Sequence, residues 1–591
     1  MNLDVLRKEI VGLDKFFKTP YGERVMTYAD YTASGRALKF VEKYLVEIQK
    51  FYANTHTEDD ITGEVMTNLL HKAEKIVKNE LNASKNCYVI EAGAGATWAV
   101  LRLSEILGLY FAPATRERFK NLIDNSDLNK EFNKNLYEEL KRELHDNGPV
   151  VFIGPYEHHS NILMWRESIA EVVEIKLNSE GYLDLEDLEN KLKDEKYSER
   201  VKVGSFSAAS NVTGIKTDVC KVADILHENN AIACFDYAAS APYVEIDMNP
   251  ENGSYLDAVF FSPHKFLGGP GACGVLVINS KLYDNSIAPT TAGGGTVDYV
   301  SELGQDYYKD PEEREKAGTP GIMQAIKAAL AIELKNKIGL EKIEELEYEY
   351  TKKFMDRFEN NENVVVLGPK DPDKRVSIIS FMIEHKGKDL HPRFITKLLN
   401  DLFGIQSRAG CACAGPYGHR LLGIDSAKSE IFRGIIQKDV HSLKPGWTRI
   451  NLHYTMTEKD IDFILAAIEF IAEYGYLFLE EYQIDLKSGS WNHINSIDQI
   501  NLINNFGIKS SFDYINKVFE YEKIIDREIE YKKYLNEAKE KAEKLKIIYS
   551  GDFKKYKDEY YESLRWFDFI NAVNHISVSY THLTLPTTPY V

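Results

Sequence analysis

Ser262-Pro-His-Lys-Phe-Leu-Gly-Gly-Pro-Gly271 follows directly on the apolar run Ala258-Val-Phe-Phe261, and this junction indicates the architecture of the protein. A short apolar run bounded by turn residues is typical of a buried β-strand. Lys265 therefore comes just after a predicted strand end and just before a glycine-rich turn. In open α/β sheets, ligands bind at the loops beyond the carboxyl ends of the strands. We expect Lys265 to lie at such a site.

The same pattern recurs from about residue 30 to residue 280, where short apolar runs alternate with amphipathic stretches. The clearest further strand candidates are Val150-Val-Phe-Ile153, Val201-Lys-Val-Gly-Ser-Phe206, Ala231-Ile-Ala-Cys-Phe235 and Gly274-Val-Leu-Val-Ile278. Between them, residues 185–192 and 219–228 have the spacing of amphipathic helices. Alternating strands and helices predict βαβ units around a mostly parallel sheet.

The chain has 591 residues, which is enough for several domains. We predict an N-terminal segment that joins the small domain (1–27), a large ligand-binding domain (28–320), a small α/β domain (321–479), a helical charged appendage (480–577) and a tail (578–591). The tail departs abruptly from the Lys/Glu-rich pattern before it and resembles a translated sequencing adapter. We expect the natural chain to be interrupted near Ser577, with a genuine Thr/Pro-rich tail as the alternative.

Composition excludes several classes of protein. Hydrophobic residues make up 44% of the chain and charged residues 28%, which fits a globular protein with a large core. The net charge of −19 and the lack of a basic, aromatic stripe argue against a nucleic-acid partner. The six cysteines are too few and too unevenly spaced for a disulfide framework, which predicts a reducing, cytoplasmic location. No apolar run approaches the roughly 18 residues of a membrane span, so no membrane partner is predicted.

Four loop segments after predicted strands carry residues that suit one cofactor. They are Glu157-His-His-Ser-Asn161, Ala209-Ser-Asn-Val-Thr-Gly214, Phe235-Asp-Tyr-Ala-Ala-Ser240 and the stretch around Lys265. A lysine amine can form a Schiff base with pyridoxal phosphate, and an acidic residue such as Asp236 can keep the pyridine nitrogen protonated. An upstream histidine can stack on the ring. Each residue alone is a weak signal, but their joint occurrence at successive strand ends predicts a pyridoxal-phosphate site.

These segments, together with Tyr28-Ala-Asp-Tyr-Thr-Ala-Ser34, resemble the class V aminotransferase family of fold-type I pyridoxal-phosphate enzymes. The resemblance covers residues 28–474 and is strongest to the cysteine desulfurases and selenocysteine lyases. It implies an α/β fold whose large domain has a mostly parallel seven-stranded sheet flanked by helices, followed by a smaller α/β domain. It also implies an enzyme that acts on an L-amino acid.

The resemblance assigns roles to individual residues. Lys265 matches the Schiff-base lysine, Asp236 the partner of the pyridine nitrogen, His158 the residue that stacks on the ring, and Asn211 the neighbour of the phenolic oxygen. The residues expected to bind the phosphate are Ala94, Gly95 and Thr97 in the turn Gly93-Ala-Gly-Ala-Thr97, together with Ser262 and His264. Small residues and a helix N-terminus suit a phosphate.

Gly293-Gly-Gly-Thr296 resembles the family's loop that reaches the phosphate site of a neighbouring subunit, which implies a homodimer in which Thr296 contacts the cofactor. A flexible surface loop is the alternative interpretation. Arg449 matches the arginine that binds the substrate's α-carboxylate, because a guanidinium forms two parallel hydrogen bonds with a carboxylate. Arg408 and Cys413 resemble the arginine and the mobile-loop cysteine of desulfurases, and that cysteine takes the substrate's sulfur as a persulfide.

Cys411 and Cys413 also permit other interpretations. A Cys-x-Cys pair can be part of a metal site, but no second pair lies nearby in the sequence, so we predict no metal. Free cysteines can also be small buried hydrophobic residues. The flanking glycines and the nearby arginine favour a reactive thiolate at Cys413.

Three departures from the desulfurase pattern leave the reaction open. Ala239 stands where the family usually has a glutamine, Cys411 where one branch has a histidine, and the phosphate turn lacks paired threonines. The resemblance implies sulfur removal from cysteine, giving alanine and an enzyme persulfide, with a possible sulfur-acceptor protein as partner. An aminotransferase or another pyridoxal-phosphate lyase acting on a different amino acid is the alternative. A non-catalytic scaffold is a remote one, because both Lys265 and Asp236 are present.

Overall fold

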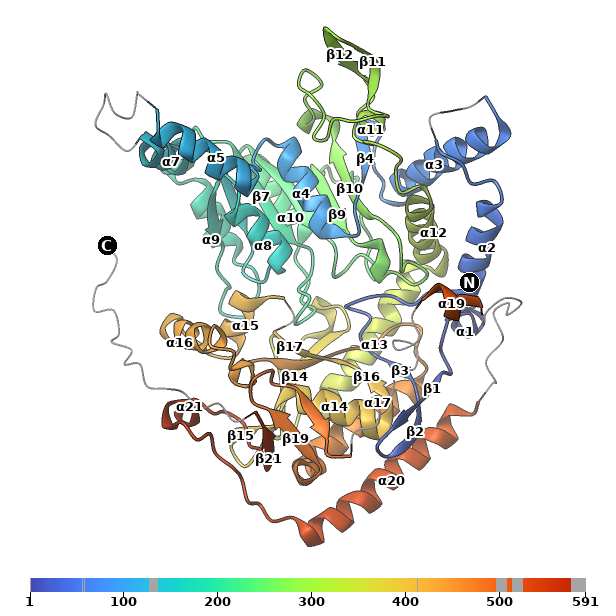
Figure 1. Ribbon diagram of the computed structural model, residues 1–591, viewed down its shortest axis with the longest axis vertical. Coiled ribbons are helices and arrows are strands. Elements are labelled where there is room, and N and C mark those ends of the chain that lie inside the picture. The colour runs from blue at the N-terminus through green and yellow to red at the C-terminus, as the bar shows by residue number, and fades with distance from the viewer. Residues whose placement is uncertain are drawn as a thin grey trace.

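The structure is a computed structural model that describes residues 2–55, 57, 59–126, 136–411, 413–495, 507–512 and 525–574. Two α/β parts lie one above the other, with the larger part at the top of Figure 1 and the smaller part below it. Each part has its own sheet and its own hydrophobic core.

The larger part is built on a seven-stranded sheet with the order β4-β10-β9-β8-β7-β5-β6. The strands are β4 (Cys87–Ala92), β5 (Val150–Ile153), β6 (Glu171–Glu174), β7 (Lys202–Ser207), β8 (Ala231–Asp236), β9 (Ala258–Phe261) and β10 (Gly274–Asn279). Only β10 runs antiparallel to its neighbours in this sheet. The predicted fold class, a mostly parallel seven-stranded sheet flanked by helices, is confirmed.

Helices cover both faces of this sheet, as expected for buried parallel strands. On one face, α4 (Ala96–Ile106) and α8 (His159–Arg166) pack Val100, Leu103 and Trp165 against the strands. The helices that pack on the other face are α3 (Ile61–Glu80), α9 (Leu185–Leu192), α10 (Val219–Glu228) and α12 (Ile322–Ile338). Both α4 and α8 begin directly after a strand end, so their N-termini point at the edge of the sheet where ligands bind.

The smaller part contains an antiparallel sheet with the order β13-β14-β18-β17, and β15 pairs with β14. The strands are β13 (Val364–Val366), β14 (Ile378–His385), β15 (Lys388–Asp389), β17 (Arg408–Gly410) and β18 (Trp447–Asn451). The helices that pack with it are α13 (Leu340–Phe358), α14 (Pro392–Phe403) and α17 (Glu458–Tyr474). The N-terminal segment lies against this part, because β3 (Thr27–Tyr28) pairs with β16 (Ile405–Gln406) and the hairpin of β1 (Phe16–Thr19) and β2 (Gly22–Val25) contacts α14.

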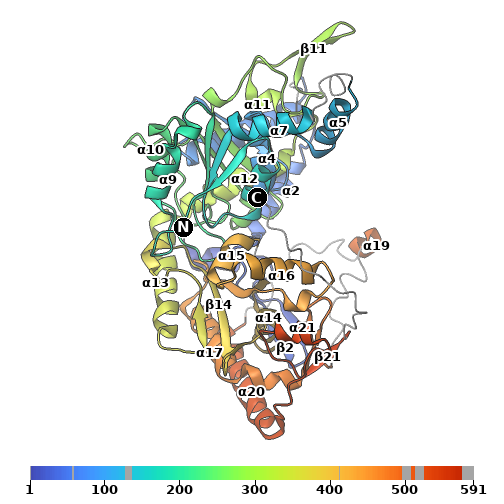
Figure 2. The same cartoon turned by 90° about the vertical axis from the view of Figure 1, so that its left-hand side faces the viewer.

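The region after residue 480 wraps around the smaller part. Its long helix α20 (Arg527–Ile548) runs along the base of the molecule in Figures 1 and 2, while β19 (Tyr482–Asp485), β20 (Trp491–His493) and β21 (Asn571–Val573) form a three-stranded sheet. The sequence predicted a helical, charged appendage with a solvated face. The structure adds strands, and one face of α20 is buried through Tyr531, Tyr534, Ala538, Ala542 and Leu545.

Tyr531 fixes α20 to the smaller part. Its ring stacks on Phe463 at a centroid distance of 3.8 Å, and its hydroxyl donates to Asp460 at 2.7 Å. The tyrosines and alanines of α20 recur at helical spacing on one face, which indicates a buried face. The many lysines and glutamates around them obscured this pattern in the sequence. The prediction for the tail 578–591 lies outside the described residues.

The hairpin of β11 (Val297–Ser301) and β12 (Gly304–Tyr307) projects from the top of the larger part (Figure 1). The remaining helices are α1 (Leu3–Lys8), α2 (Lys39–Gln49), α5 (Pro113–Asp124), α7 (Leu136–Asn147), α11 (Pro311–Arg314), α15 (Gly415–Leu421), α16 (Ser426–Ile436), α19 (Ile508–Ser511) and α21 (Glu559–Ser563). Among the described residues, no helix combines the length and the apolarity that crossing a membrane requires.

Candidate active site

A cavity of about 450 Å³ lies between the strand ends of the larger part and the sheet of the smaller part. Twelve of the thirteen residues singled out in the sequence line it: Ala94, Gly95, Thr97, His158, Asn211, Asp236, Ser262, His264, Lys265, Arg408, Cys413 and Arg449. Thr296 is the exception. It is buried in the projecting loop, where its hydroxyl donates to the Gly293 carbonyl at 2.7 Å.

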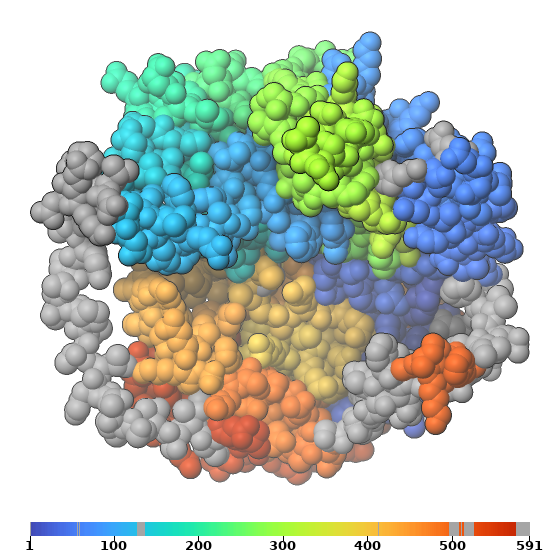
Figure 3. All heavy atoms as spheres, turned by 45° about the horizontal axis from the view of Figure 1, so that its top comes forward, coloured from blue at the N-terminus to red at the C-terminus, as the bar shows by residue number. Residues whose placement is uncertain are grey.

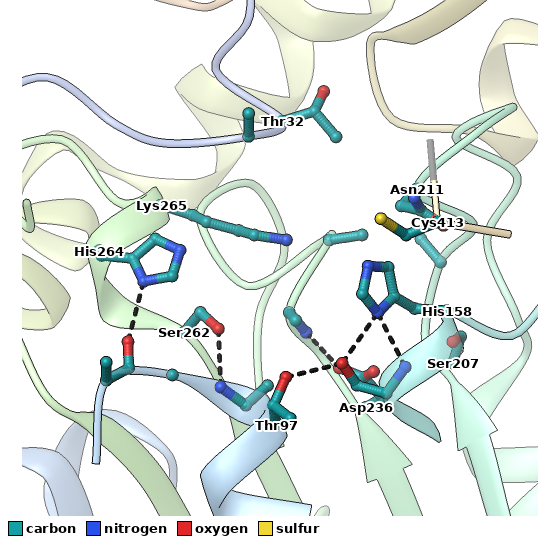
Figure 4. Close-up of a pocket in the computed structure, with 18 of the residues that line it drawn as sticks. Thr32, Thr97, His158, Ser207, Asn211, Asp236, Ser262, His264, Lys265 and Cys413 are labelled. Carbon is teal, nitrogen blue, oxygen red and sulfur yellow. Dashed lines mark hydrogen bonds between the residues drawn. The ribbon is translucent and has the colours of Figure 1, made fainter. Parts of the chain in front are cut away.

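Lys265 enters the cavity from the short 3₁₀ turn that follows β9. Figure 4 shows its amine extending toward the side where His158, Asn211 and Cys413 lie. Burial lowers the pKa of Lys265 to about 8, and the negative charge of Asp236 offsets part of that effect. About a tenth of the amine is therefore neutral at pH 7, far more than for a lysine with an ordinary pKa, and the neutral amine is the nucleophilic form.

Asp236 is the last residue of β8 and is only 4% exposed. Its Oδ1 accepts the Ala238 N–H at 2.8 Å, which fixes the carboxyl at the base of the cavity. Burial raises the pKa of Asp236 to about 6, while this hydrogen bond and the Lys265 charge act in the opposite direction. The carboxylate thus provides a buried negative charge that can pair with a cationic nitrogen of a ligand.

His158 caps the N-terminus of α8, with its Nδ1 accepting the Ser160 N–H at 3.1 Å. Burial lowers the pKa of His158 to about 3, and the positive charge of Lys265 contributes further. The imidazole is therefore neutral over the physiological range. A neutral ring held by a helix cap is suited to stacking on an aromatic ligand.

The turn between β4 and α4 has the features of an anion-binding cradle. The Ala96 N–H donates to Ser262 Oγ at 2.8 Å, and His264 Nδ1 lies 3.1 Å from the Ala94 carbonyl that accepts its hydrogen. A Cβ placed on Gly95 would come within 3.0 Å of Ser262 Oγ and 3.2 Å of the His264 ring, so any side chain there would fill the cradle. The N-terminus of α4 adds a favourable dipole for an anion.

Arg449 lies on β18, almost completely buried at the opposite wall. Its Nη1 donates to the Asn211 carbonyl and its Nη2 to Asp30 Oδ1, each at 3.0 Å. Its Nε has no hydrogen-bond partner among the described residues. A buried guanidinium with an unused donor fits a carboxylate ligand, because leaving that donor unpaired costs free energy.

Cys413 reaches the cavity from the loop before α15, and Figure 4 shows its sulfur on the same side as Asn211 and His158. His159 holds this loop at two points. Its N–H donates to the Cys413 carbonyl at 2.7 Å, and its Nε2 accepts the Gly415 N–H at 2.8 Å. Cys413 has a φ of +59°, a left-handed conformation uncommon for a residue with a side chain.

Sequence reasoning missed the roles of two residues. Asp30 pairs with Arg449, and His159 anchors the thiol loop. Both lie inside segments that the sequence had singled out, but their partners are far away in the chain. Among the described residues, no group of three His, Cys, Asp or Glu side chains is placed to hold a metal ion.

The family model described as Aminotransferase class-V matches residues 133–464. The chain belongs to this family. A probable cysteine desulfurase of Halalkalibacterium halodurans is 33% identical over 303 residues, which is 51% of this chain and 70% of that protein. A probable cysteine desulfurase of Pyrococcus abyssi is 32% identical over 335 residues, which is 53% of this chain and 79% of that protein.

Solved structures agree on the fold. A cysteine desulfurase of Thermococcus onnurineus aligns with a TM-score of 0.59 at 24% identity, covering 80% of this chain and 98% of that one. A cysteine desulfurase of Escherichia coli gives the same TM-score at 20% identity. This chain is therefore a class V aminotransferase family enzyme, similar in sequence to probable cysteine desulfurases and in fold to solved cysteine desulfurases.

Proposed function

We propose that this class V enzyme is a pyridoxal-phosphate-dependent cysteine desulfurase, which removes sulfur from L-cysteine and holds it on Cys413. The observation that carries the proposal is one cavity lined by the amine of Lys265, the buried carboxylate of Asp236 and the thiol of Cys413. The first two groups suit the cofactor, and the third suits sulfur transfer.

The cavity fits pyridoxal phosphate. The glycine cradle at Gly95 would bind the phosphate, Lys265 would hold the cofactor covalently through its amine, and Asp236 would pair with the ring nitrogen. His158 would cover the ring and Asn211 would lie beside its phenolic oxygen. When bound, pyridoxal phosphate supplies an electron sink that weakens the bonds at the substrate's α-carbon.

The chain's own residues position the substrate and move its protons. Arg449 binds the α-carboxylate through the Nε that lacks a partner among the described residues, and through Nη2 once Asp30 yields it. Once the substrate's amine has replaced it on the cofactor, the freed amine of Lys265 would take the proton from the α-carbon and return it later.

Cys413 then takes the sulfur. Its thiolate attacks the substrate's sulfur, an S–S bond forms as the substrate's C–S bond breaks, and the β-carbon receives a proton to give alanine. The enzyme is left with a persulfide, so the sum is cysteine plus thiol giving alanine plus persulfide. A sulfur-acceptor protein or a small thiol then removes the outer sulfur.

The test measures alanine and sulfide from L-cysteine in the presence of dithiothreitol, with the purified chain loaded with pyridoxal phosphate. We expect equal amounts of both products from the parent and neither from Cys413→Ala, whose cofactor absorbance should be unchanged. A Cys220→Ala variant, changed on α10 outside the cavity, serves as the matched control and should behave like the parent. If Cys413→Ala matches the parent, Cys413 is not the sulfur nucleophile, and amino-acid and keto-acid pairs should be assayed for transamination.

A homodimer is part of the proposal. The projecting hairpin exposes Tyr299, Val300 and the fully exposed Leu303, and α2 exposes Phe40 and Tyr44. Figure 3 shows the yellow-green hairpin region standing out beside the blue N-terminal helices. Apolar groups of this size on a surface are typical of an interface. Thr296 is buried in the loop before the hairpin, so that loop would have to rearrange in a dimer for Thr296 to reach the partner's cavity. Sedimentation of the chain tests the oligomeric state.

A further inference from the structure

A second cavity, of about 190 Å³, adjoins the thiol loop. Arg408 and Cys413 line both this cavity and the active site, whereas Cys411 lines only the second one. The thiol that is proposed to take sulfur from the substrate therefore borders two spaces. The first holds the reaction, and the second contains another thiol and no part of the proposed cofactor site.

The second cavity suits an anionic sulfur species. Arg393, Arg408 and Lys444 line it, and no acidic residue does among the described part of the chain. Persulfides lose their proton more readily than thiols, so they are anions near neutral pH. Positive side chains close by favour the anion over the protonated form.

The described residues after 480 do not line this cavity but pack behind two residues that do, His391 and Arg393. His391 lines the cavity, and its Nε2 lies 3.3 Å from the Ser442 carbonyl that accepts its hydrogen. Behind it, the Trp566 ring is stacked on the imidazole at a centroid distance of 5.3 Å, and Phe567 meets it edge-on at 4.8 Å. The Arg393 guanidinium donates to the Ser488 carbonyl at 2.6 Å. The cavity is thus supported by packed aromatic groups and fixed donors.

Cys411 and Cys413 belong to one turn, closed by the hydrogen bond from the Ala414 N–H to the Cys411 carbonyl at 3.1 Å. Their Cα atoms are two peptide steps apart, so they cannot be separated by more than about 7.6 Å. A sulfur–sulfur bond needs Cα atoms within about 6.8 Å, which lies inside this limit. Sulfur can then pass between the two thiols, because a thiolate attacks a sulfur–sulfur bond directly.

We propose that Cys411 takes the outer sulfur from the Cys413 persulfide and presents it in the second cavity. This inference rests on the proposed function. The Cys411 thiolate attacks the outer sulfur, its new S–S bond forms as the old one breaks, and Cys413 leaves as a thiolate that takes up the proton Cys411 lost. No oxidant or reductant is consumed. Cys413 is then free for a second molecule of cysteine before any acceptor arrives.

The experiment follows the sulfur without added reductant. The holoenzyme is mixed with half an equivalent of L-cysteine per subunit, quenched with an alkylating agent at successive times, and the persulfide is located by fragmenting the peptide that contains both cysteines. In the parent we expect the persulfide on Cys413 first and on Cys411 later. Cys411→Ser should retain it on Cys413, and the control Cys220→Ser should match the parent.

A second readout is the burst of alanine with excess cysteine. We expect about two alanines per subunit from the parent and from Cys220→Ser, and about one from Cys411→Ser. Persulfide found only on Cys413 in the parent, with alanine formed, would overturn the relay and leave the proposed function standing. A Cys411–Cys413 disulfide with released sulfide would also overturn it. Absence of alanine from the parent would overturn both proposals.

Discussion

Replacing Lys265 with methionine should stabilise the cofactor-free protein while abolishing cofactor binding. Burial lowers the pKa of Lys265 from 10.5 to about 8, so the charged amine is held in the fold at a cost. A shift of about 2.5 units corresponds to about 3 kcal/mol. This destabilisation is fully present below pH 8 and declines as the pH rises from 8 to 10.5; above 10.5 the amine is neutral in both states. Lys265→Met removes it.

The assay is urea unfolding of the cofactor-free parent and variant at pH 7 and at pH 10.5. We expect the variant to be more stable than the parent by up to about 3 kcal/mol at pH 7 and nearly equal to it at pH 10.5.

Lys335→Met is the matched control. Burial also lowers the pKa of Lys335 to about 8, and its amine donates to the Val244 carbonyl. Lys335→Met should show the same dependence of stability on pH. Its gain in stability should be smaller by about 1 kcal/mol, because the variant also loses the hydrogen bond to Val244, and it should still bind the cofactor. A Lys265→Met variant less stable than the parent at pH 7, or a gain independent of pH, would refute the reasoning.

Three further outcomes are expected. Gly95→Ala should weaken pyridoxal-phosphate binding at least tenfold without unfolding the protein, because the added Cβ would approach Ser262 Oγ to 3.0 Å. Titration of the cofactor absorbance measures the affinity. An unchanged affinity would contradict the assignment of this turn to the phosphate. His159→Ala should lose the hydrogen bond from the Gly415 N–H, which is worth about 1 kcal/mol. Quenched flow should then show slower persulfide formation than in the parent, with a smaller effect on cofactor binding. A rate of persulfide formation equal to that of the parent would show that the loop does not depend on His159. Tyr531→Ala should lower the stability of the smaller part by about 3–5 kcal/mol in thermal unfolding, because the side chain is buried and stacked on Phe463. Tyr560 is half exposed and serves as the comparison. If Tyr531→Ala costs less stability than Tyr560→Ala, α20 does not pack as described.

Local patterns were sufficient to predict the strands that carry the site. Both β8, which ends at Asp236, and β9, which leads to Lys265, are short apolar runs, because they are buried in the centre of a parallel sheet. The edge strand β6 has glutamate at each end and only half-buried residues, so it has no apolar signal. Strand β4 begins at Cys87 and contains Tyr88 and Glu91, which blurs its pattern.

Contacts between distant residues could not be read from the sequence. The ion pair of Asp30 and Arg449 joins residues 419 positions apart, and His159 binds a loop 256 residues away. Such pairs depend on how the two parts pack, which no local spacing encodes. The buried face of α20 was predictable in principle from its tyrosine and alanine spacing, but the surrounding lysines and glutamates dominate its composition.

The central claim is that Lys265 binds pyridoxal phosphate in the cavity it shares with Cys413. The most direct measurement is to load the chain with the cofactor, reduce it with borohydride, and locate the modified lysine by peptide mass spectrometry. The account predicts a single modified site at Lys265, absent from Lys265→Met and unchanged in Lys335→Met. Modification at another lysine, or none in a folded protein, would contradict it.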